Sequence, residues 1–169
     1  SKTSQQIRFE VIYELLGAHI TSSKIIDAGC GFGDFYLFLK QKGALPRFYV
    51  GYAMMDAMLE VAAKKTGQKC LKCDILKDEL EEADFYIASG SMNILNRFET
   101  HLFIHRCFEA SRKGFVFNLL KGEDKEGHFN YFLPHEIEAY VNEFAYDVKI
   151  KDDYMEGDFT VLLLKEATE

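Results

Sequence analysis

The sequence predicts a single α/β domain in which a mostly parallel sheet of seven strands lies between two layers of helices. Three observations support this fold class. Short β-branched or aromatic runs alternate with segments of helical periodicity, glycine turns separate them, and the last two strands follow each other without a helix between them. The length of 169 residues is that of one domain.

The first strand–turn–helix unit follows an amino-terminal helix. Residues 7–20 place apolar side chains at spacings of three and four, which is typical of an amphipathic helix. Residues 24–28 are rich in β-branched side chains and end in the glycine turn 29–33, after which helical spacing resumes over residues 34–41. A buried strand is therefore expected to lead through a glycine turn into a helix.

This unit is then repeated along the chain. A second strand is expected at residues 47–52 and a second helix at residues 56–65, so the first two strands should pair in parallel. The last two strands should form an antiparallel hairpin at one end of the sheet. The remaining elements are expected in this order: a strand at 69–72, an acidic surface helix or loop at 78–84, a strand at 85–88, a helix at 97–112, a strand at 114–119, a helix at 134–144, and strands at 146–151 and 159–164.

Composition limits the classes of function. The chain has 20 basic and 27 acidic residues, a formal charge of −7, and no stretch gathers five or six basic residues, which disfavours nucleic acid as a partner. The longest apolar runs are far shorter than the ~18 residues of a membrane span. With 4 cysteines and no secretory leader at the front of the sequence, we expect free thiols and a soluble, cytoplasmic protein without a membrane partner.

The glycine turn is the first candidate site, because open α/β sheets bind ligands beyond the carboxyl ends of their strands. The dinucleotide fingerprint needs glycines at its first, third and sixth positions, whereas here they are Gly29, Gly31 and Gly33. No Gly-Lys-Ser/Thr of a phosphate loop follows. Asp27, just before the turn, would repel phosphates and suits a ligand with an ammonium group. The pattern therefore favours a zwitterionic amino-acid tail.

The motif around this turn resembles that of a known family. It reads Asp27-Ala28-Gly29-Cys30-Gly31-Phe32-Gly33 and is similar to the first motif of the class I S-adenosylmethionine-dependent methyltransferases, Asp/Glu-x-Gly-x-Gly-x-Gly. Further matches are Tyr49-Val50-Gly51 with residues 58–62, Cys73-Asp74-Ile75, and residues 84–90. The resemblance implies one methyltransferase-like domain over residues 1–169, with an N-terminal helix in 1–20 and a Rossmann-like core in 24–169.

The resemblance also implies a cofactor, S-adenosylmethionine, and the residues that hold it. Asp27, Gly29 and Gly31 would surround the methionine moiety. Asp74 would accept a hydrogen bond from the adenine amino group, and Ile75 and Met54 would enclose the ring. A plain tight turn and a helix N-cap at Asp74 are the alternatives that involve no ligand. The full expected set is Asp27, Gly29, Cys30, Gly31, Gly33, Ala53, Met54, Asp74, Ile75 and Ser89.

One position departs from the family pattern. Two residues after Gly51 the family has a carboxylate that binds both ribose hydroxyls, and here Ala53 stands in its place. Loss of such a charge-assisted hydrogen bond costs about 1.5–3 kcal/mol. Asp56 is the nearest replacement, or else it caps the second helix. A substituted residue, a natural variant with other ribose contacts, and a domain that no longer catalyses are all consistent with Ala53.

The expected chemistry is methyl transfer to an O, N or C nucleophile of a small molecule. Ser89-Gly90-Ser91-Met92-Asn93 follows the fourth strand, where substrates of the family enter, and Asn93 is predicted to orient the acceptor, with a turn residue as the alternative. The segment does not contain the Asn/Asp-Pro-Pro-aromatic motif that the family uses on planar exocyclic amines, which disfavours nucleobase N-methylation and glutamine methylation. A catalytically silent binding module and a methyltransferase acting on RNA are the alternative functions.

Other candidate residues carry weaker signals. No metal site is predicted, because His101 and His105 lack a third ligand and Cys70 and Cys73 should point to opposite faces of a strand. A group of residues on or between the last two strands is a second candidate for the substrate side, with core packing as the alternative. The group consists of Tyr146, Tyr154, Asp158 and Phe159.

The charged, glycine-flanked segment 121–130 is expected to order over a bound substrate.

Overall fold

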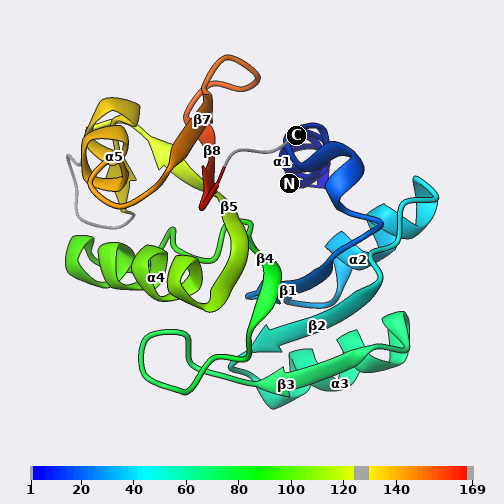
Figure 1. Ribbon diagram of the computed structural model, residues 1–169. Helices are drawn as coiled ribbons and strands as arrows, with labels where there is room; N and C mark the ends of the chain where they lie inside the picture. Colours follow the sequence, from blue (N-terminus) through cyan, green and yellow to red (C-terminus); the bar gives the residue numbers. More distant parts are fainter. Residues whose placement is uncertain (1, 124–129, 167–169) are drawn as a thin grey trace.

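A twisted sheet in the order β3-β2-β1-β4-β5-β8-β7 runs through the molecule (Figure 1). The computed structural model describes residues 2–123 and 130–166. β1 to β5 are parallel, and β8 is antiparallel to both β5 and β7. The strands are β1 (Lys24–Ala28), β2 (Phe48–Ala53), β3 (Lys69–Lys72), β4 (Ala83–Ala88), β5 (Ser111–Lys121), β6 (Tyr131–Phe132), β7 (Asp147–Lys151) and β8 (Asp158–Leu164).

The predicted fold class is confirmed. All seven expected strands form, the sheet is mostly parallel, and its last hairpin is antiparallel. The additional strand is β6, which has two residues and pairs with the end of β5. Two residues are too few to show the alternation of apolar and polar side chains that reveals a strand in a sequence.

Helices cover both faces of this sheet. α1, α2 and α3 lie on one face, and α4 and α5 on the other (Figure 1). No helix in the described parts of the chain has the length and hydropathy needed to cross a membrane. The helical elements are α1 (Lys2–Leu16), the 3₁₀ turn η1 (Gly17–His19), α2 (Asp34–Gln41), α3 (Asp56–Thr66), α4 (Arg97–Ala110) and α5 (Pro134–Val141).

The connection from β3 to β4 has no helix. The sequence predicts either a helix or a loop for the acidic stretch 78–84. In the structure, residues 73–82 form an irregular connection, so the loop alternative is the correct one. Two tyrosine hydroxyls hold it: Tyr52 Oη accepts the Glu81 N–H at 3.1 Å, and Tyr86 Oη donates to the Glu81 carbonyl. Because side chains supply partners for this backbone, it needs no helical hydrogen bonds here.

Some boundaries differ from the expected ones. α1 starts at Lys2 rather than residue 7, and α5 ends at Val141 rather than 144. α4 ends at Ala110, because Ser111 is already extended and begins β5. The Ser111 hydroxyl donates to the Phe108 carbonyl at 2.7 Å, which satisfies one of the carbonyls left open at the helix end.

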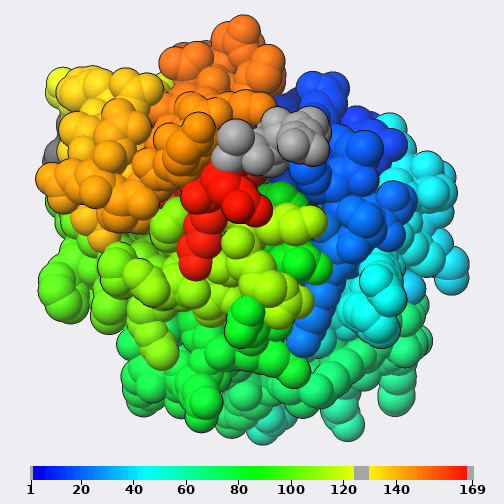
Figure 2. All heavy atoms as spheres, viewed as in Figure 1, coloured from blue at the N-terminus to red at the C-terminus, as the bar shows by residue number. Residues whose placement is uncertain are grey.

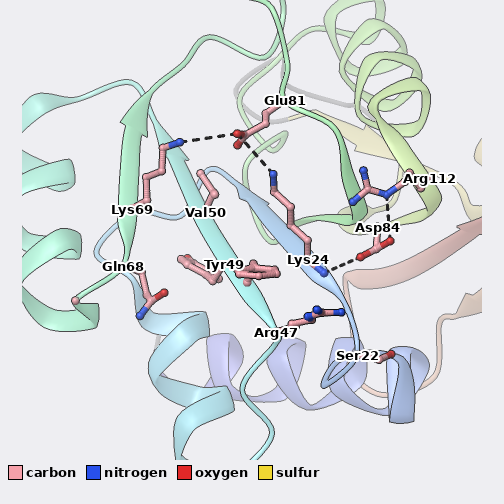
Figure 3. Close-up of a pocket in the computed structure, with 12 residues that line it drawn as sticks. Ser22, Lys24, Arg47, Tyr49, Val50, Gln68, Lys69, Glu81, Asp84 and Arg112 are labelled. Carbon is pink, nitrogen blue, oxygen red and sulfur yellow. Dashed lines mark hydrogen bonds and ion pairs between the residues drawn. The ribbon is translucent and has the colours of Figure 1, made fainter.

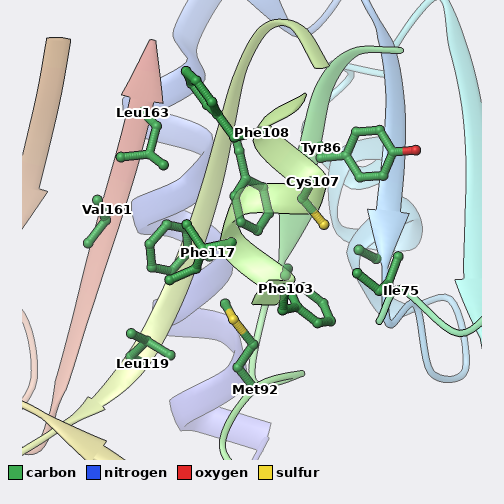
Figure 4. Packing of buried hydrophobic residues seen from close by; sticks show 14 of the residues in the cluster. Ile75, Tyr86, Met92, Phe103, Cys107, Phe108, Phe117, Leu119, Val161 and Leu163 are labelled. Atoms are coloured by element: carbon green, nitrogen blue, oxygen red, sulfur yellow. The ribbon is translucent and has the colours of Figure 1, made fainter. Parts of the chain in front are cut away.

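Aromatic side chains fill the core on both faces. Between the sheet and α4, Phe103 and Cys107 belong to one buried cluster with Phe117 and Val161 (Figure 4). The last strand is an inner strand of the sheet: in the view of Figure 2, β8 (red) lies between β7 (orange) and β5 (yellow-green). β1 and β4 are buried along almost their whole length, which fixes the positions of the loops at their carboxyl ends.

Candidate functional site

The glycine turn after β1 is hydrogen-bonded to the neighbouring strand. The N–H groups of Gly29 and Cys30 both donate to the Tyr52 carbonyl of β2, at 2.9 and 2.8 Å. Within residues 2–123 and 130–166, the N–H groups of Gly31 and Phe32 make no hydrogen bond. The turn is therefore held rigidly while two of its donors remain available to a ligand.

Two cavities meet at this turn. The large cavity has a volume of about 490 Å³ and the small cavity about 170 Å³. Both are lined by Gly29, Gly31 and Ser89, so they adjoin. The large cavity also contains Ala53, Met54, Met55, Met58, Asp74, Ile75, Ile94 and Leu95, and the small cavity Gln5, Phe9, Asp27, Cys30, Phe32, Asp34 and Phe35.

The structure thus brings together residues that lie far apart in the sequence. As expected from the sequence, Gly29, Met54, Asp74 and Ser89 surround one cavity. They follow β1, β2, β3 and β4 respectively, so they lie at the carboxyl edge of the sheet. The strand order reverses there, because β2 and β3 lie on one side of β1 whereas β4 and β5 lie on the other. Ile75 and Ala53 line the same cavity, and Asp27 and Cys30 line the small one.

Gly29 and Gly31 have different structural roles. Both have positive φ, +98° and +53°. A Cβ at Gly29 would lie 2.2 Å from the Ser91 hydroxyl, which donates to the Ala28 carbonyl at 2.7 Å. A Cβ at Gly31 would meet nothing within 4 Å, although Gly31 lines both cavities. The absence of a side chain at Gly29 therefore lets the loop after β4 pack against the turn, and the absence of one at Gly31 leaves room for a ligand to approach the backbone.

Asp27 is the buried charge of the site. Its carboxylate is 3% exposed and accepts a hydrogen bond from the Tyr49 hydroxyl at 2.7 Å. Burial raises the pKa of Asp27 to about 7, the bond from Tyr49 opposes this, and the charge of Asp34 adds to it. A positively charged group in the small cavity would favour the ionised carboxylate and lower this pKa.

Asp74 forms a turn of its own. Its Oδ1 accepts the Leu76 N–H at 2.9 Å, and its Oδ2 lies 3.9 Å from Lys77 Nζ. The alternative of a helix N-cap is wrong, because no helix follows it. Asp74 keeps one carboxylate oxygen free of backbone bonds while lining the large cavity, beside the buried Ile75 and the 57% exposed Met54.

Gly33 lines neither cavity. A Cβ there would lie 2.6 Å from Thr66 Cγ2 and 3.5 Å from Ala62 Cα of α3. It is also the residue that precedes α2, with φ +87°. The expectation of a ligand contact is therefore replaced by a packing role: Gly33 lets the start of α2 approach α3.

Asn93 also lies outside the lining of both cavities, although Ser91 and Ile94 beside it line the large one. The expectation that Asn93 faces this cavity is not met, because its carbonyl accepts the Asn130 N–H at 2.9 Å and fixes the loop. Its side-chain Oδ1 is buried and has no hydrogen-bond partner among the described residues. Its catalytic role stays a prediction.

Asp56, the candidate to replace the carboxylate expected at position 53, lies outside both cavities. Ala53 is 7% exposed and lines the large cavity, whereas Asp56 lines neither cavity. The Asp56 side chain is 82% exposed and lies 3.6 Å from Lys72 Nζ. Asp56 is the first residue of α3, and Met55 is the N-cap, so the expected cap is displaced by one residue.

Sequence reasoning missed a buried asparagine that organises the loop after β4. Asn118 of β5 is 1% exposed; its Oδ1 accepts the Gly90 N–H at 2.7 Å and its Nδ2 donates to Ser89 Oγ at 2.8 Å. The feature of the sequence that could have revealed Asn118 is that it is a single amide residue inside the apolar run 115–120. Gln5 and Phe9 of α1, which line the small cavity, have no such signal.

Of the weaker candidates for metal binding, His101, His105 and Cys70 line neither cavity, whereas Cys73 lines the large one. The His101 ring stacks on Tyr140 with centroids 4.2 Å apart. Cys70 and Cys73 belong to different hydrophobic clusters, as their strand spacing predicts. Among residues 2–123 and 130–166, no group of three or more His, Cys, Asp or Glu could hold a metal ion.

The group on the last two strands is largely structural. Tyr154 donates to Asp158, which is also paired with Arg8 of α1 at 3.0 Å, and Phe159 is a core residue. Tyr146 is 67% exposed. Positions 124–129 of the charged segment lie outside the described residues.

The comparisons with known proteins agree with this geometry. Neither protein-family models nor the sequences of curated proteins match this chain. Its structure resembles magnesium protoporphyrin IX methyltransferase from Synechocystis PCC 6803 with a TM-score of 0.79 and 11% identity, over 97% of this chain and 84% of the other.

Two further solved structures are similar. The methyltransferase domain of bacterial CtHen1-CN has a TM-score of 0.72 and 15% identity, over 95% of this chain and 98% of the other. A SAM-dependent methyltransferase from Thermotoga maritima has a TM-score of 0.68 and 16% identity, over 96% and 92%. At these identities the likeness establishes the fold: the chain has the Rossmann-like fold of class I S-adenosylmethionine-dependent methyltransferases.

Proposed function

We propose that this protein is a single-domain methyltransferase that uses S-adenosylmethionine to methylate an O, N or C nucleophile of a small molecule in the cytoplasm. The observation that carries the proposal is the pair of adjoining cavities at the glycine turn, with the buried Asp27 in the small one and Asp74 in the large one. The formal charge of −7 favours a small molecule over nucleic acid as the acceptor.

The residues present fit this cofactor. The small cavity offers a buried carboxylate for an ammonium group, and the N–H groups of Gly31 and Phe32 for a carboxylate. The large cavity offers Asp74 for an adenine amino group, between Ile75 and Met54. Magnesium protoporphyrin IX methyltransferase, which shares the fold, was solved with SAH and with SAM bound.

When bound, S-adenosylmethionine supplies an electrophilic methyl group on a sulfonium. The chain's contribution is to hold the acceptor close to that group and to exclude water. Gln5 and Phe9 of α1 close the outer side of the small cavity, and Arg8 ties α1 to Asp158 of β8. Asn118 fixes the loop through which we expect the acceptor to enter.

We assign Asn93 the role of orienting the acceptor. Its buried Oδ1 lacks a partner in the described parts of the chain, so a donor group on the acceptor would satisfy it. The amide lies beside Gly90, which lines the large cavity: Asn93 Nδ2 is 3.9 Å from the position that a Cβ at Gly90 would occupy. Asn93→Ala should therefore lower turnover while leaving cofactor affinity unchanged.

The test is a transfer assay with methyl-labelled S-adenosylmethionine, offered with a small-metabolite extract and, separately, with total tRNA. We expect label in the small-molecule fraction. Label in tRNA alone would replace the acceptor class with RNA.

A second candidate function is a methyltransferase-like binding module without catalysis. The observation that favours it is Ala53 together with the exposed Asp56, because among the described residues neither position offers a carboxylate to the large cavity at that end of β2. The same assay separates the two functions. Cofactor binding without transfer to any fraction would support the silent module.

A further inference from the structure

A further cavity lies at the opposite edge of the sheet from the glycine turn. This amino-edge cavity has a volume of about 680 Å³ and is lined by residues at the starts of β1, β2, β3, β4 and β5 (Figure 3). It shares no lining residue with the large or the small cavity. Its volume is typical of a small-molecule site.

The lining of this cavity is positively charged, although the chain as a whole is acidic. Four basic side chains and two acidic ones, Glu81 and Asp84, line it. A basic excess inside a concave site attracts anions even when the net charge of the protein is −7. The basic side chains are Lys24, Arg47, Lys69 and Arg112.

The ion pairs of this cavity leave positive charge uncompensated. Lys24 and Lys69 share one oxygen of Glu81, at 3.6 and 3.8 Å (Figure 3). Arg112 is paired with Asp84 at 3.2 Å and with Glu82 at 3.3 Å, so its own charge is compensated. Arg47 has no carboxylate within 4 Å among the described residues, so its guanidinium is available to an external anion.

Glu81 is fixed in place and has an unused acceptor. Its backbone is held at both ends by the hydroxyls of Tyr52 and Tyr86. Its Oε1 faces the two lysines, whereas its Oε2 is buried and has no partner in the described structure. A hydroxyl or amino donor on a ligand would satisfy this oxygen.

An exposed aromatic ring completes the lining. Phe48 is 59% exposed, and the Arg47 guanidinium lies 5.6 Å from the centre of its ring. Gln68, with an amide that both donates and accepts, lines the same cavity. Together these groups match a ligand with an anionic group, a hydroxyl- or amine-bearing part and a flat ring.

We propose that the amino-edge cavity is a second small-molecule site, which binds a nucleoside phosphate. The phosphate contacts Arg47 and Lys69, the ring lies against Phe48, and Glu81 accepts from a sugar hydroxyl or a base amino group. This site is independent of methyl transfer, because none of its lining residues belongs to the cavities of the glycine turn.

The test is calorimetric titration of the full chain with adenosine monophosphate, with and without saturating S-adenosylhomocysteine to occupy the glycine-turn cavities. Arg47→Gln removes the available guanidinium. The matched control is Lys64→Gln, which removes an exposed positive charge of α3 outside all three cavities. Adenosine and inorganic phosphate are titrated separately to divide the contributions of the two halves of the ligand.

We expect adenosine monophosphate to bind, unaffected by S-adenosylhomocysteine and by Lys64→Gln. Arg47→Gln should weaken binding by about tenfold or more, and adenosine or phosphate alone should bind at least about tenfold more weakly. The proposal is overturned by absence of binding up to about 10 mM, where even weak complexes are detected. Equal affinity of the Arg47→Gln variant, or loss of binding when S-adenosylhomocysteine is present, overturns it as well.

Discussion

Gly31 and Gly17 share the same backbone conformation but differ in their surroundings. Both have φ +53°, and a Cβ at either would meet nothing within 4 Å. Gly31 lines both glycine-turn cavities, whereas Gly17 lies in η1, away from them. We predict that Gly31→Val abolishes binding of S-adenosylhomocysteine, because a branched side chain occupies the space of the ligand.

Gly17→Val is the matched control for this prediction. It carries the same backbone strain, about 1–2 kcal/mol, so both variants should lose similar stability in urea unfolding. Only Gly31→Val should lose the ligand in a calorimetric titration. Equal affinities of the two variants would show that Gly31 does not border the ligand.

Asp27 should make the stability of the protein depend on pH. Its pKa in the folded protein is about 7, above its ordinary value of 3.8, so the native state keeps a proton that the unfolded chain has lost between these values. The stability from this group is therefore full below about pH 4 and is lost as the pH rises through 7.

We predict that the wild type loses about 2 kcal/mol more stability between pH 5.5 and pH 8 than Asp27→Asn does. The reason is that asparagine keeps an acceptor for the Tyr49 hydroxyl but does not ionise. Urea unfolding at both pH values measures the difference. Parallel pH profiles of the two proteins would mean that Asp27 is not the titrating group.

Ala53 offers a direct test of the ribose end of the large cavity. We predict that Ala53→Asp tightens S-adenosylhomocysteine binding by roughly 10- to 150-fold, the value of a charge-assisted hydrogen bond. Ala53→Asn, which has the same shape without the charge, is the control and should gain less. An unchanged affinity of Ala53→Asp would contradict a ribose at this position.

At the residue scale, the sequence predicted what is local in the chain. Asp27 and Gly31 belong to one continuous motif, so their proximity follows from the strand and turn that contain them. Tyr49 and Asn118 act on this site from other strands, through hydrogen bonds of 2.7–2.8 Å. Such contacts depend on the pairing register of the sheet, which no local pattern contains.

At the scale of elements, α2 is bounded by two glycines that differ in packing. Gly33 precedes it with φ +87°, and Gly43 follows it with φ +65°. A Cβ at Gly33 would lie 2.6 Å from Thr66 Cγ2, whereas a Cβ at Gly43 would meet nothing within 4 Å. Alanine at either position strains the backbone, but only Gly33→Ala forces α2 and α3 apart.

We therefore predict that Gly33→Ala lowers the free energy of unfolding by about 1–3 kcal/mol more than Gly43→Ala does. Urea unfolding of both variants measures this difference. Gly33→Ala should still bind S-adenosylhomocysteine at saturating ligand, because Gly33 lines neither cavity. Equal destabilisation of the two variants would mean that the helices adapt without cost.

Most elements were predicted close to their observed bounds, including the short and partly polar β3. The seven strands and the helix 34–41 were predicted within a few residues. The connection 73–82 was not assigned, because the hydroxyls of Tyr52 and Tyr86 decide its conformation from distant strands. The amino-edge cavity is lined by side chains of five different strands, so it could not be predicted from any local pattern in the sequence.

At the scale of the whole molecule, the sheet separates two concave sites. The carboxyl ends of β1 to β4 hold the glycine-turn cavities, and the amino ends of β1 to β5 hold the amino-edge cavity. Periodicity predicted the strands and the final hairpin, whereas the order of the strands followed from the resemblance to a family. The observed order, β3-β2-β1-β4-β5-β8-β7, is what places the turn, Asp74 and Ser89 around one cavity.

The most direct test of the proposed function is calorimetric titration of the wild-type chain with S-adenosylmethionine and S-adenosylhomocysteine, with NAD as the control ligand. We expect saturable binding of both sulfur ligands at one site and no binding of NAD, because the glycine spacing and Asp27 disfavour a pyrophosphate. Saturable binding of NAD without heat from either sulfur ligand would contradict the proposed function.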